Sequence, residues 1–145
     1  CLVGSEMCIR DRRYNIKGKD VVAGNCKYYL NDLSFKNFLY PGFAYGVGYL
    51  LENAVYLELR RLGYIVYTGS FRDKEVDFVA MKDDRVIYLQ ATYMLETAQT
   101  MEREYAPLLT IGDNYEKYVV SMDEVQFPSN EGVRHIQAWN LKEIL

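Results

Sequence analysis

Hydrophobic residues recur at helical spacing between residues 47 and 62, and this is the clearest pattern in the chain. Four aliphatic residues fall at i, i+4, i+8 and i+11 and would share one helix face: Leu51, Val55, Leu59 and Leu62. Gly63 follows at once, and glycine at that place is typical of a helix C-terminus. The sequence therefore predicts a helix over 47–62.

Three apolar runs after this helix predict strands: YIVYTG, KEVDFVAM and RVIYLQATYML. Asp83 and Asp84 supply the turn between the second and the third run. A helix over 96–109 follows, with Pro107 in its final turn. Two more strands are expected in EKYVVSM and RHIQAWN, and a last helical turn in LKEIL. This order predicts an α/β fold, a mixed central sheet flanked by helices.

Ahead of the long helix, residues 13–30 predict two short strands, with turns at KGK and AGN. Asn31 or Asp32 would cap a short helix over LSFKNFL. Glycines and a proline then cluster between 41 and 48, which is typical of a flexible connection between two parts. We therefore expect a boundary near residue 46, between a segment over 13–46 and a domain over 47–145.

Residues 1–12, CLVGSEMCIRDR, show neither periodicity nor a helix cap. Their back-translation resembles the adapter of transposon-based sequencing libraries, so we interpret them as translated adapter and exclude them from the fold. Without Cys1 and Cys8, Cys26 is the one native cysteine, and no disulfide can form within the chain. We expect residues 1–12 to pack against nothing and the natural N-terminus to be missing.

The composition is typical of one globular domain with a mild excess of acid. The formal net charge is −3, 50% of the residues are hydrophobic and 14 are tyrosines. No apolar run approaches the roughly 18 residues that cross a membrane, so no membrane partner is expected. The acidic balance argues against a broad nucleic-acid-binding face. A single thiol and mild acidity favour a cytoplasmic protein.

Three polar residues interrupt apolar patterns and are therefore candidate site residues. Glu52 flanks the apolar stripe of the predicted helix, Asp77 lies inside the strand segment VDFV, and Gln90 lies inside YLQA. A charged side chain within an apolar strand costs several kcal/mol unless it is paired or binds a metal. Asp77 is accordingly the strongest single candidate.

This arrangement resembles the PD-(D/E)XK nuclease superfamily, in which a helix supplies a glutamate, the second strand an aspartate and the third strand Glu-x-Lys. The resemblance implies a restriction-endonuclease-like core, with Glu52 and Asp77 as the catalytic acids that hold Mg²⁺. The metal would activate water for attack on a phosphodiester. Gln90, Ala91 and Thr92 would then occupy the Glu-x-Lys positions.

Two departures from the nuclease pattern argue against catalysis. Gln90 can still ligate through its carbonyl oxygen but carries no charge, and Thr92 stands in place of the lysine. Loss of one preorganised electrostatic donor costs about 10²–10³ in rate. Lys74 and Lys82 lie at strand ends and are not placed to substitute. A working nuclease is therefore not expected.

Each candidate also has a structural interpretation. Glu52 could be a boundary residue of an amphipathic helix, and Gln90 could hydrogen-bond across the sheet. Asp77 could be satisfied by Lys74, Arg72 or a backbone turn.

His135, the single histidine, is expected to be packed or at the surface rather than catalytic. No Ser-His-Asp triad can be assembled with specificity. No G-x-x-x-x-G-K-[ST] motif is present, so a P-loop for ATP is absent from this sequence.

A closer resemblance covers nearly all of residues 13–145. The stretches that carry it, in order, are RYNIKGK, KYYLNDLSFKN, LLENAVYLELRRLGYIVYTG, DKEVDFVA, IYLQATY, EREYAPLLTIGDNYEKYVVSMDE and RHIQAWNLKEIL. Together they resemble the C-terminal domain of unknown function in many prokaryotic AAA-type ATPases. The resemblance implies that a P-loop ATPase domain, which binds ATP, and a winged-helix-like segment precede this module. Residues 13–46 would then be the end of that winged-helix-like segment.

Three functions remain open from the sequence. The first is a non-catalytic, nuclease-like accessory module of an AAA-type ATPase that positions DNA or a protein partner. The second is a weak Mg²⁺-dependent DNA nuclease that uses Glu52, Asp77 and Gln90. The third is a protein-interaction or oligomerisation domain without nucleic-acid contact.

Overall fold

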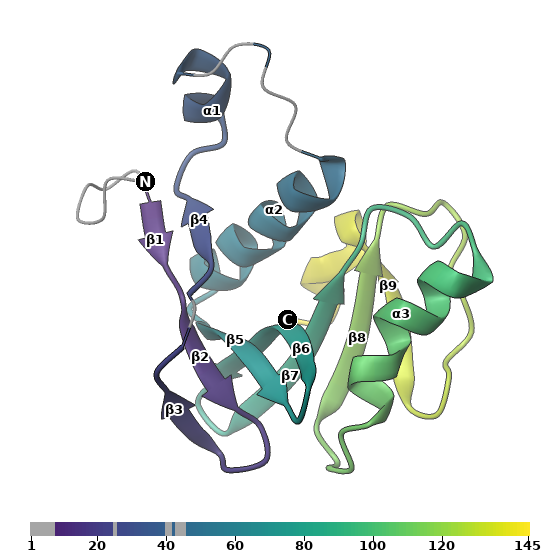
Figure 1. Ribbon diagram of the computed structural model, residues 1–145. Helices are drawn as coiled ribbons and strands as arrows, with labels where there is room; N and C mark the ends of the chain where they lie inside the picture. The colour runs from purple at the N-terminus through teal and green to yellow at the C-terminus, as the bar shows by residue number, and fades with distance from the viewer. Residues whose placement is uncertain (1–7, 25, 40–41, 43–45) are drawn as a thin grey trace.

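The computed structural model describes residues 8–24, 26–39, 42 and 46–145, and all structural statements concern these residues. Seven of the described strands form one mixed sheet in the order β3-β2-β5-β6-β7-β8-β9, and β1 pairs with β4 in a separate ribbon (Figure 1). The elements in chain order are β1 (Cys8–Arg10), β2 (Arg12–Asn15), β3 (Asp20–Val22), β4 (Tyr28–Leu30), α1 (Ser34–Leu39), α2 (Val47–Arg61), β5 (Ile65–Phe71), β6 (Lys74–Lys82), β7 (Arg85–Ala91), α3 (Ala98–Leu109), β8 (Glu116–Ser121), β9 (Val133–Gln137) and the 3₁₀ helix η1 (Ala138–Glu143).

The centre of the sheet is an antiparallel meander of β5, β6 and β7. α3 then crosses over, so that β8 lies parallel to β7, and β9 lies parallel to β8. Parallel neighbours need such a crossover connection, whereas antiparallel ones can be joined by a tight turn. The predicted α/β fold with a mixed central sheet flanked by helices is confirmed.

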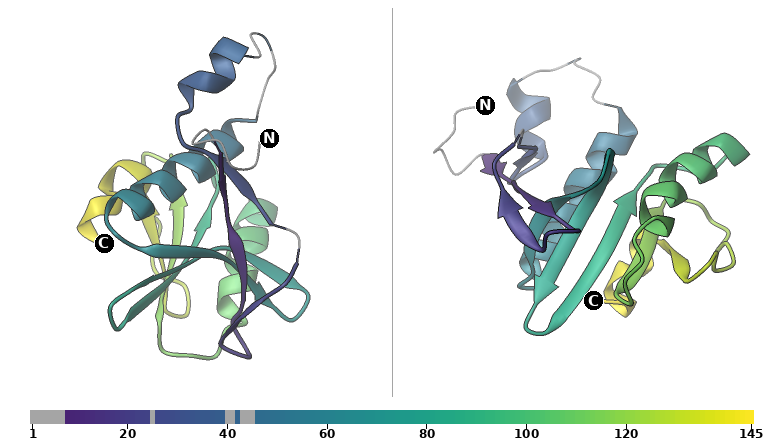
Figure 2. Two further views of the ribbon diagram at one scale, coloured as in Figure 1. Left: turned by 90° about the vertical axis from the view of Figure 1, so that its left-hand side faces the viewer. Right: turned by 60° about the horizontal axis from the view of Figure 1, so that its bottom comes forward.

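The sheet is the middle of three layers, with α2 and η1 on one face and α3 on the other (Figure 2). On the α2 face, Leu51, Val55 and Leu59 pack against Phe78, Leu89 and other sheet residues. On the α3 face, Tyr105 and Leu108 pack against a second set of sheet residues, Val76, Val79, Tyr88, Val119 and Val133. Both faces of the central strands are therefore buried, which explains their nearly continuous apolar sequence.

The helix predicted over 47–62 is confirmed as α2, and its predicted stripe faces the sheet. Gly63 has φ +88°, the left-handed conformation that a glycine adopts at low cost after a helix. α3 begins at Ala98, and its N-cap is Thr97, which was not predicted. The Thr97 hydroxyl accepts a hydrogen bond from the Thr100 N–H at 3.1 Å. Pro107 lies in its last turn, as predicted.

Two predicted strand ends are wrong. The strand expected to reach residue 95 ends at Ala91, because the Leu95 N–H then donates to the Asp123 side chain at 2.9 Å instead of to a neighbouring strand. The strand expected over RHIQAWN ends at Gln137. The following residues form η1, which buries Leu141 against the α2 side of the sheet.

The expectation that residues 1–12 pack against nothing is wrong for residues 8–12. β1 pairs with β4, and Asp11 is only 2% exposed, its carboxylate accepting a hydrogen bond from the Thr68 hydroxyl at 2.6 Å. Because this stretch is hydrogen-bonded and the Asp11 side chain is buried, the packing of residues 8–12 counts against their interpretation as translated adapter. Residues 1–7 lie outside the described residues.

The segment over 13–46 shares the sheet of the following domain. Residues 13–30 hold parts of three strands, β2, β3 and β4, rather than the two that were expected. β2 and β3 are antiparallel and flank the expected turn at KGK, where Lys19 has φ +54°, and β2 lies parallel to β5. The Asp32 carboxylate caps α1 by accepting a hydrogen bond from the Ser34 N–H at 2.8 Å, as predicted. Parts of the expected turn over AGN and of the glycine-rich connection fall outside the described residues.

One core tyrosine gives a stability prediction. The Tyr105 hydroxyl is buried and makes no hydrogen bond with any described residue, whereas the Tyr88 hydroxyl donates to Asp113 at 2.7 Å. Removal of an unsatisfied buried group relieves its desolvation cost. Tyr105→Phe should therefore raise the free energy of unfolding in urea by about 1 kcal/mol, and the control Tyr88→Phe should lower it by about 1 kcal/mol. Equal losses in the two variants would contradict this assignment.

Candidate functional site

The candidate site lies where β4 and α2 meet β6. Asn53 of α2 holds β4 in place, because its side-chain amide accepts from the Leu30 N–H at 2.8 Å and donates to the Leu30 carbonyl at 2.9 Å. This pair of bonds imitates a strand neighbour for the end of β4. It brings Tyr29 and Lys27 beside Glu52, the residue that precedes Asn53.

Asp77 reaches the same place because β6 contains a bulge. Tyr67 of β5 is paired with Val79 of β6, and Gly69 is paired with Val76. Two residues along β5 therefore match three along β6, so β6 carries one extra residue. The bulge breaks the alternation of the strand, so that Val76 packs on the α3 side and Phe78 on the α2 side. Asp77 lies within this bulge, and bulges commonly re-aim a side chain next to a functional site.

The two acidic candidates meet at a lysine that the sequence did not single out. The Lys27 Nζ lies 2.8 Å from the Glu52 Oε1 and 2.8 Å from the Asp77 Oδ1. These two oxygens therefore lie no further apart than twice that distance, and the ammonium group bridges them. The structure brings Glu52 and Asp77 together, as the sequence predicted, but the bridging cation is an ammonium group.

Further polar groups complete this cluster. The Tyr29 hydroxyl donates to Glu52 Oε1 at 2.9 Å, and its ring stacks on Tyr56 with the centroids 4.1 Å apart. Glu75 Oε1 lies 3.1 Å from the Lys27 Nζ in an ion pair, and Glu75 also pairs with Arg13. Three carboxylates thus contact the Lys27 ammonium, and we call Lys27, Glu52, Glu75 and Asp77 the lysine cluster.

Gln90 forms a hydrogen bond across the sheet, which was the structural alternative for this residue. Its side-chain oxygen accepts a hydrogen bond from the Asp77 N–H at 3.2 Å, and the Ala91 N–H donates to Asp77 Oδ2 at 3.0 Å. The two bonds continue the β6–β7 pairing beyond Phe78↔Leu89, where the regular ladder ends. Among the described residues, no hydrogen bond or ion pair joins Thr92 to Glu52 or Asp77, and the Thr92 N–H donates to the Val120 carbonyl at 3.0 Å.

The electrostatics keep Lys27 charged. Burial acts against the ammonium, but the carboxylates of Asp77 and Glu52 outweigh it and raise the pKa of Lys27. Burial raises the pKa of Asp77, and the neighbouring ammonium opposes that increase. Burial and the adjacent Glu52 raise the pKa of the Tyr29 hydroxyl, which therefore remains a hydrogen-bond donor at neutral pH.

The sequence singled out no lysine to take the place of the nuclease lysine, and in the structure Lys27 lies between the two acids. For Asp77 the sequence left Lys74, Arg72 or a backbone turn open as partners, but the structure pairs it with Lys27 and the Ala91 N–H. The part of the chain that the structure describes holds no group of three or more Asp, Glu, His or Cys residues arranged for a metal ion.

A serine, a histidine and an aspartate also meet at the end of β8, although the sequence suggested no specific triad. The His135 Nδ1 accepts from the Phe127 N–H at 3.1 Å, so the ring carries its proton on Nε2 and donates it to the Ser121 hydroxyl at 2.8 Å. Ser121 in turn donates to Asp123 at 2.6 Å. In a catalytic triad the histidine lies between the serine and the aspartate. In this buried series of hydrogen bonds the serine lies between the histidine and the aspartate. Of the packed and the surface position expected for His135, the structure shows the packed one, because the residue is 2% exposed.

The histidine makes stability depend on pH. Burial lowers the pKa of His135, and Asp123 opposes this shift. Because the unfolded chain takes up the proton near pH 6.5 and the folded chain only at lower pH, stability should fall as the pH drops from about 6.5. Urea unfolding between pH 7 and pH 5 should show a smaller loss for His135→Gln than for the unchanged chain. Parallel pH profiles would contradict the assignment.

Comparison with known proteins finds a relative in Haemophilus influenzae. Over 110 residues the chain is 34% identical to an uncharacterized protein of Haemophilus influenzae, a match that covers 76% of this chain and 27% of that protein. The chain therefore spans about a quarter of the length of the relative that it matches. No family model matches the chain. No solved structure matches it either.

Proposed function

We propose that this chain is a non-catalytic, nuclease-like accessory module of a larger cytoplasmic AAA-type ATP-binding protein, and that it contacts a protein partner. The observation that carries the proposal is the position of Lys27, whose ammonium bridges Glu52 and Asp77. In a nuclease of this design the same two acids hold the metal that activates water. Here one ammonium group of the same protein pairs with both acids.

The order of elements supports the nuclease-like part of the proposal. A helix that supplies Glu52, an antiparallel meander that supplies Asp77 and Gln90, a crossover helix and a parallel strand follow one another as the resemblance implies. The match to a much longer relative is compatible with a module of a larger protein. The absence of catalysis would follow from Gln90 as well, because its oxygen is engaged by the Asp77 N–H.

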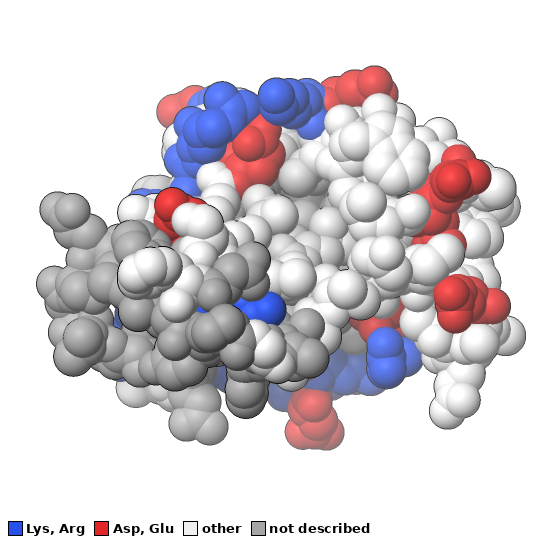
Figure 3. Space-filling view, turned by 90° about the horizontal axis from the view of Figure 1, so that it is seen from above, with Lys and Arg blue, Asp and Glu red and all other residues white. Residues whose placement is uncertain are grey.

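The charge distribution favours a protein partner over DNA. Several arginines that could contact phosphates pair with carboxylates instead: Arg61 with Glu58, Arg85 and Arg134 with Glu116, and Arg103 with Glu104. Basic and acidic side chains are interspersed on the face shown in Figure 3, and much of that face is uncharged. Affinity for DNA depends on cations that are free to displace counterions.

Exposed apolar side chains are available for contact with a protein partner. Tyr93, Met94 and Met122 are all exposed just beyond the ends of β7 and β8, and the Met122 N–H donates to the Tyr93 carbonyl at 2.9 Å. Aromatic residues and methionine are enriched in protein–protein interfaces. In the described residues, neither α2 nor α3 has the length and apolar character that crossing a membrane requires.

The proposal is tested first by a nuclease and DNA-binding assay. We expect no cleavage of single- or double-stranded DNA with Mg²⁺ or Mn²⁺, and no DNA binding in fluorescence anisotropy even at low salt, where electrostatic binding is strongest. Metal-dependent cleavage that Asp77→Asn abolishes would favour the weak nuclease that uses Glu52, Asp77 and Gln90. Binding of DNA without cleavage would contradict the proposal that the partner is a protein.

The ATPase context is tested separately by reading the intact gene. The proposal expects a P-loop motif, G-x-x-x-x-G-K-[ST], encoded upstream of this module. A natural gene without that motif would contradict the AAA-type context and leave an interaction or oligomerisation domain as the function.

A further inference from the structure

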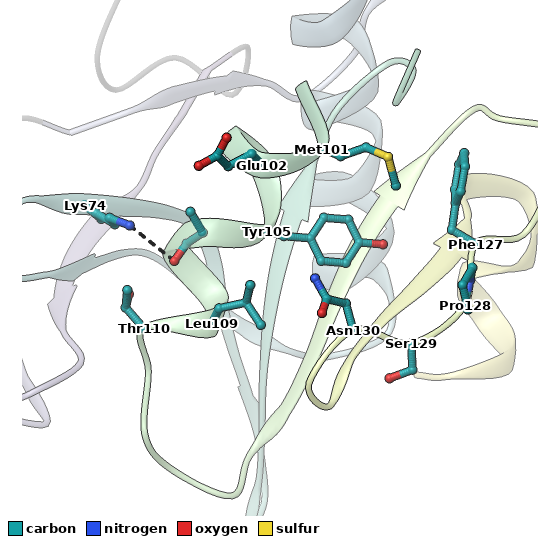
Figure 4. A pocket seen from close by; sticks show the side chains of 11 residues that line it. Lys74, Met101, Glu102, Tyr105, Leu109, Thr110, Phe127, Pro128, Ser129 and Asn130 are labelled. Carbon is teal, nitrogen blue, oxygen red and sulfur yellow. Dashed lines mark hydrogen bonds between the residues drawn. The ribbon is translucent and has the colours of Figure 1, made fainter. Parts of the chain in front are cut away.

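A pocket lies on the face of the sheet opposite the lysine cluster. It lies between α3 and residues 127–130 and has a volume of about 640 Å³ (Figure 4). Pockets for small molecules in proteins commonly measure about 300–1,000 Å³. The walls are mainly apolar: Met101, Tyr105, Ala106, Leu109, Phe127 and Pro128.

One end of the pocket carries a positive charge without a carboxylate partner. The Lys74 Nζ donates to the Ala106 carbonyl at 3.4 Å and forms no ion pair with any described residue. Glu102 also belongs to the lining, and in Figure 4 its carboxylate points away from Tyr105, to the side on which Lys74 lies, but no ion pair joins Glu102 to Lys74. The ammonium is therefore available to a negatively charged group in the pocket.

Tyr105 supplies a second and independent feature. Its ring extends from α3 toward Phe127 along the pocket, and its buried hydroxyl makes no hydrogen bond with any described residue (Figure 4). Buried polar groups in native proteins nearly always have a partner. A polar atom of a bound molecule that reached this hydroxyl would supply the missing hydrogen bond.

We propose that this pocket binds a small aromatic anion. The aromatic body would lie between the apolar residues of α3 and the Phe127–Pro128 segment, and its anionic group would lie near Lys74. This site is separate from the proposed partner contact, because it lies on the α3 face rather than at the ends of β7 and β8.

The test uses two probes that differ by one charge. 8-Anilinonaphthalene-1-sulfonate is an aromatic anion, and N-phenyl-1-naphthylamine has the same rings without the sulfonate; fluorescence titration gives the dissociation constant of each. Lys74→Gln should weaken binding of the anion by about two- to five-fold, as expected for one exposed ion pair. It should leave binding of the neutral probe unchanged, and the control Lys82→Gln should change neither.

Ala106→Met places a larger side chain in the pocket and should abolish saturable binding of both probes, while thermal unfolding confirms that the variant is folded. The proposal is overturned when neither probe binds the unchanged chain saturably. It is equally overturned when Ala106→Met leaves both dissociation constants unchanged, because the probes would then bind elsewhere. An equal effect of Lys74→Gln and Lys82→Gln on the anion would exclude Lys74 as the recognising cation.

Discussion

Replacement of Lys27 by methionine is expected to lower the free energy of unfolding by about 2–4 kcal/mol. The side chain is 25% exposed, and its ammonium contacts Glu52, Glu75 and Asp77. Removal of one partner from a buried ion pair leaves the other charges desolvated and unpaired, which costs about 3–5 kcal/mol for fully buried pairs and less for partly exposed ones. Urea unfolding at neutral pH measures the difference.

The matched control is Lys17→Met, because Lys17 is an exposed residue of the β2–β3 turn. Its substitution should change stability by less than about 0.5 kcal/mol. The double variant Lys27→Met/Asp77→Asn should regain part of the loss, since one unpaired charge is then absent. Equal stability of the Lys17 and Lys27 variants would contradict the role given to the lysine cluster.

Phe78→Ala is expected to cost about 3–5 kcal/mol, the other large effect. Phe78 is 0% exposed, follows Asp77 in the bulge, and packs its ring against Tyr29 and Tyr56 at centroid distances of 5.9 Å and 6.3 Å. A truncated side chain would leave a cavity beneath the site, in addition to the lost burial of the ring.

Phe38→Ala is the control for this substitution, because the Phe38 side chain is 82% exposed. It should leave the free energy of unfolding within about 0.5 kcal/mol of the unchanged chain. The account of the core would be contradicted if both variants lost the same stability in urea.

The central elements could be predicted because their patterns are local. The stripe of α2 and the three strands after it follow from residues a few positions apart, and the turns at Gly63 and Asp83 have the positive φ values that end such elements. The ends of β7 and β9 could not be predicted, because they depend on contacts with distant residues such as Asp123 and on the burial of Leu141.

The pairing of Glu52 with Asp77 could be predicted from the nuclease-like order of elements, but the cation between them could not. Lys27 lies 25 residues before Glu52 and 50 before Asp77, and it reaches them only because Asn53 fixes the end of β4. A weak signal was present: Lys27 and Tyr29 are two residues apart, so in an extended segment they share a face. A buried tyrosine on that face would have directed attention to the lysine.

The prediction about residues 8–12 failed for a related reason. The stretch has no periodic pattern, yet its backbone pairs with β4 and continues toward β2 in the sheet. Backbone hydrogen bonds do not require a recognisable side-chain pattern, so a short strand of three residues leaves little trace in the sequence.

The central claim is that an ammonium group, and not a metal ion, bridges Glu52 and Asp77. Isothermal titration calorimetry with Mn²⁺ tests it most directly, because Mn²⁺ accepts the oxygen ligands that Mg²⁺ prefers. We predict no saturable binding to the unchanged chain, since Lys27 occupies the space between the two carboxylates. One-to-one binding of Mn²⁺ that Asp77→Asn abolishes would contradict the account.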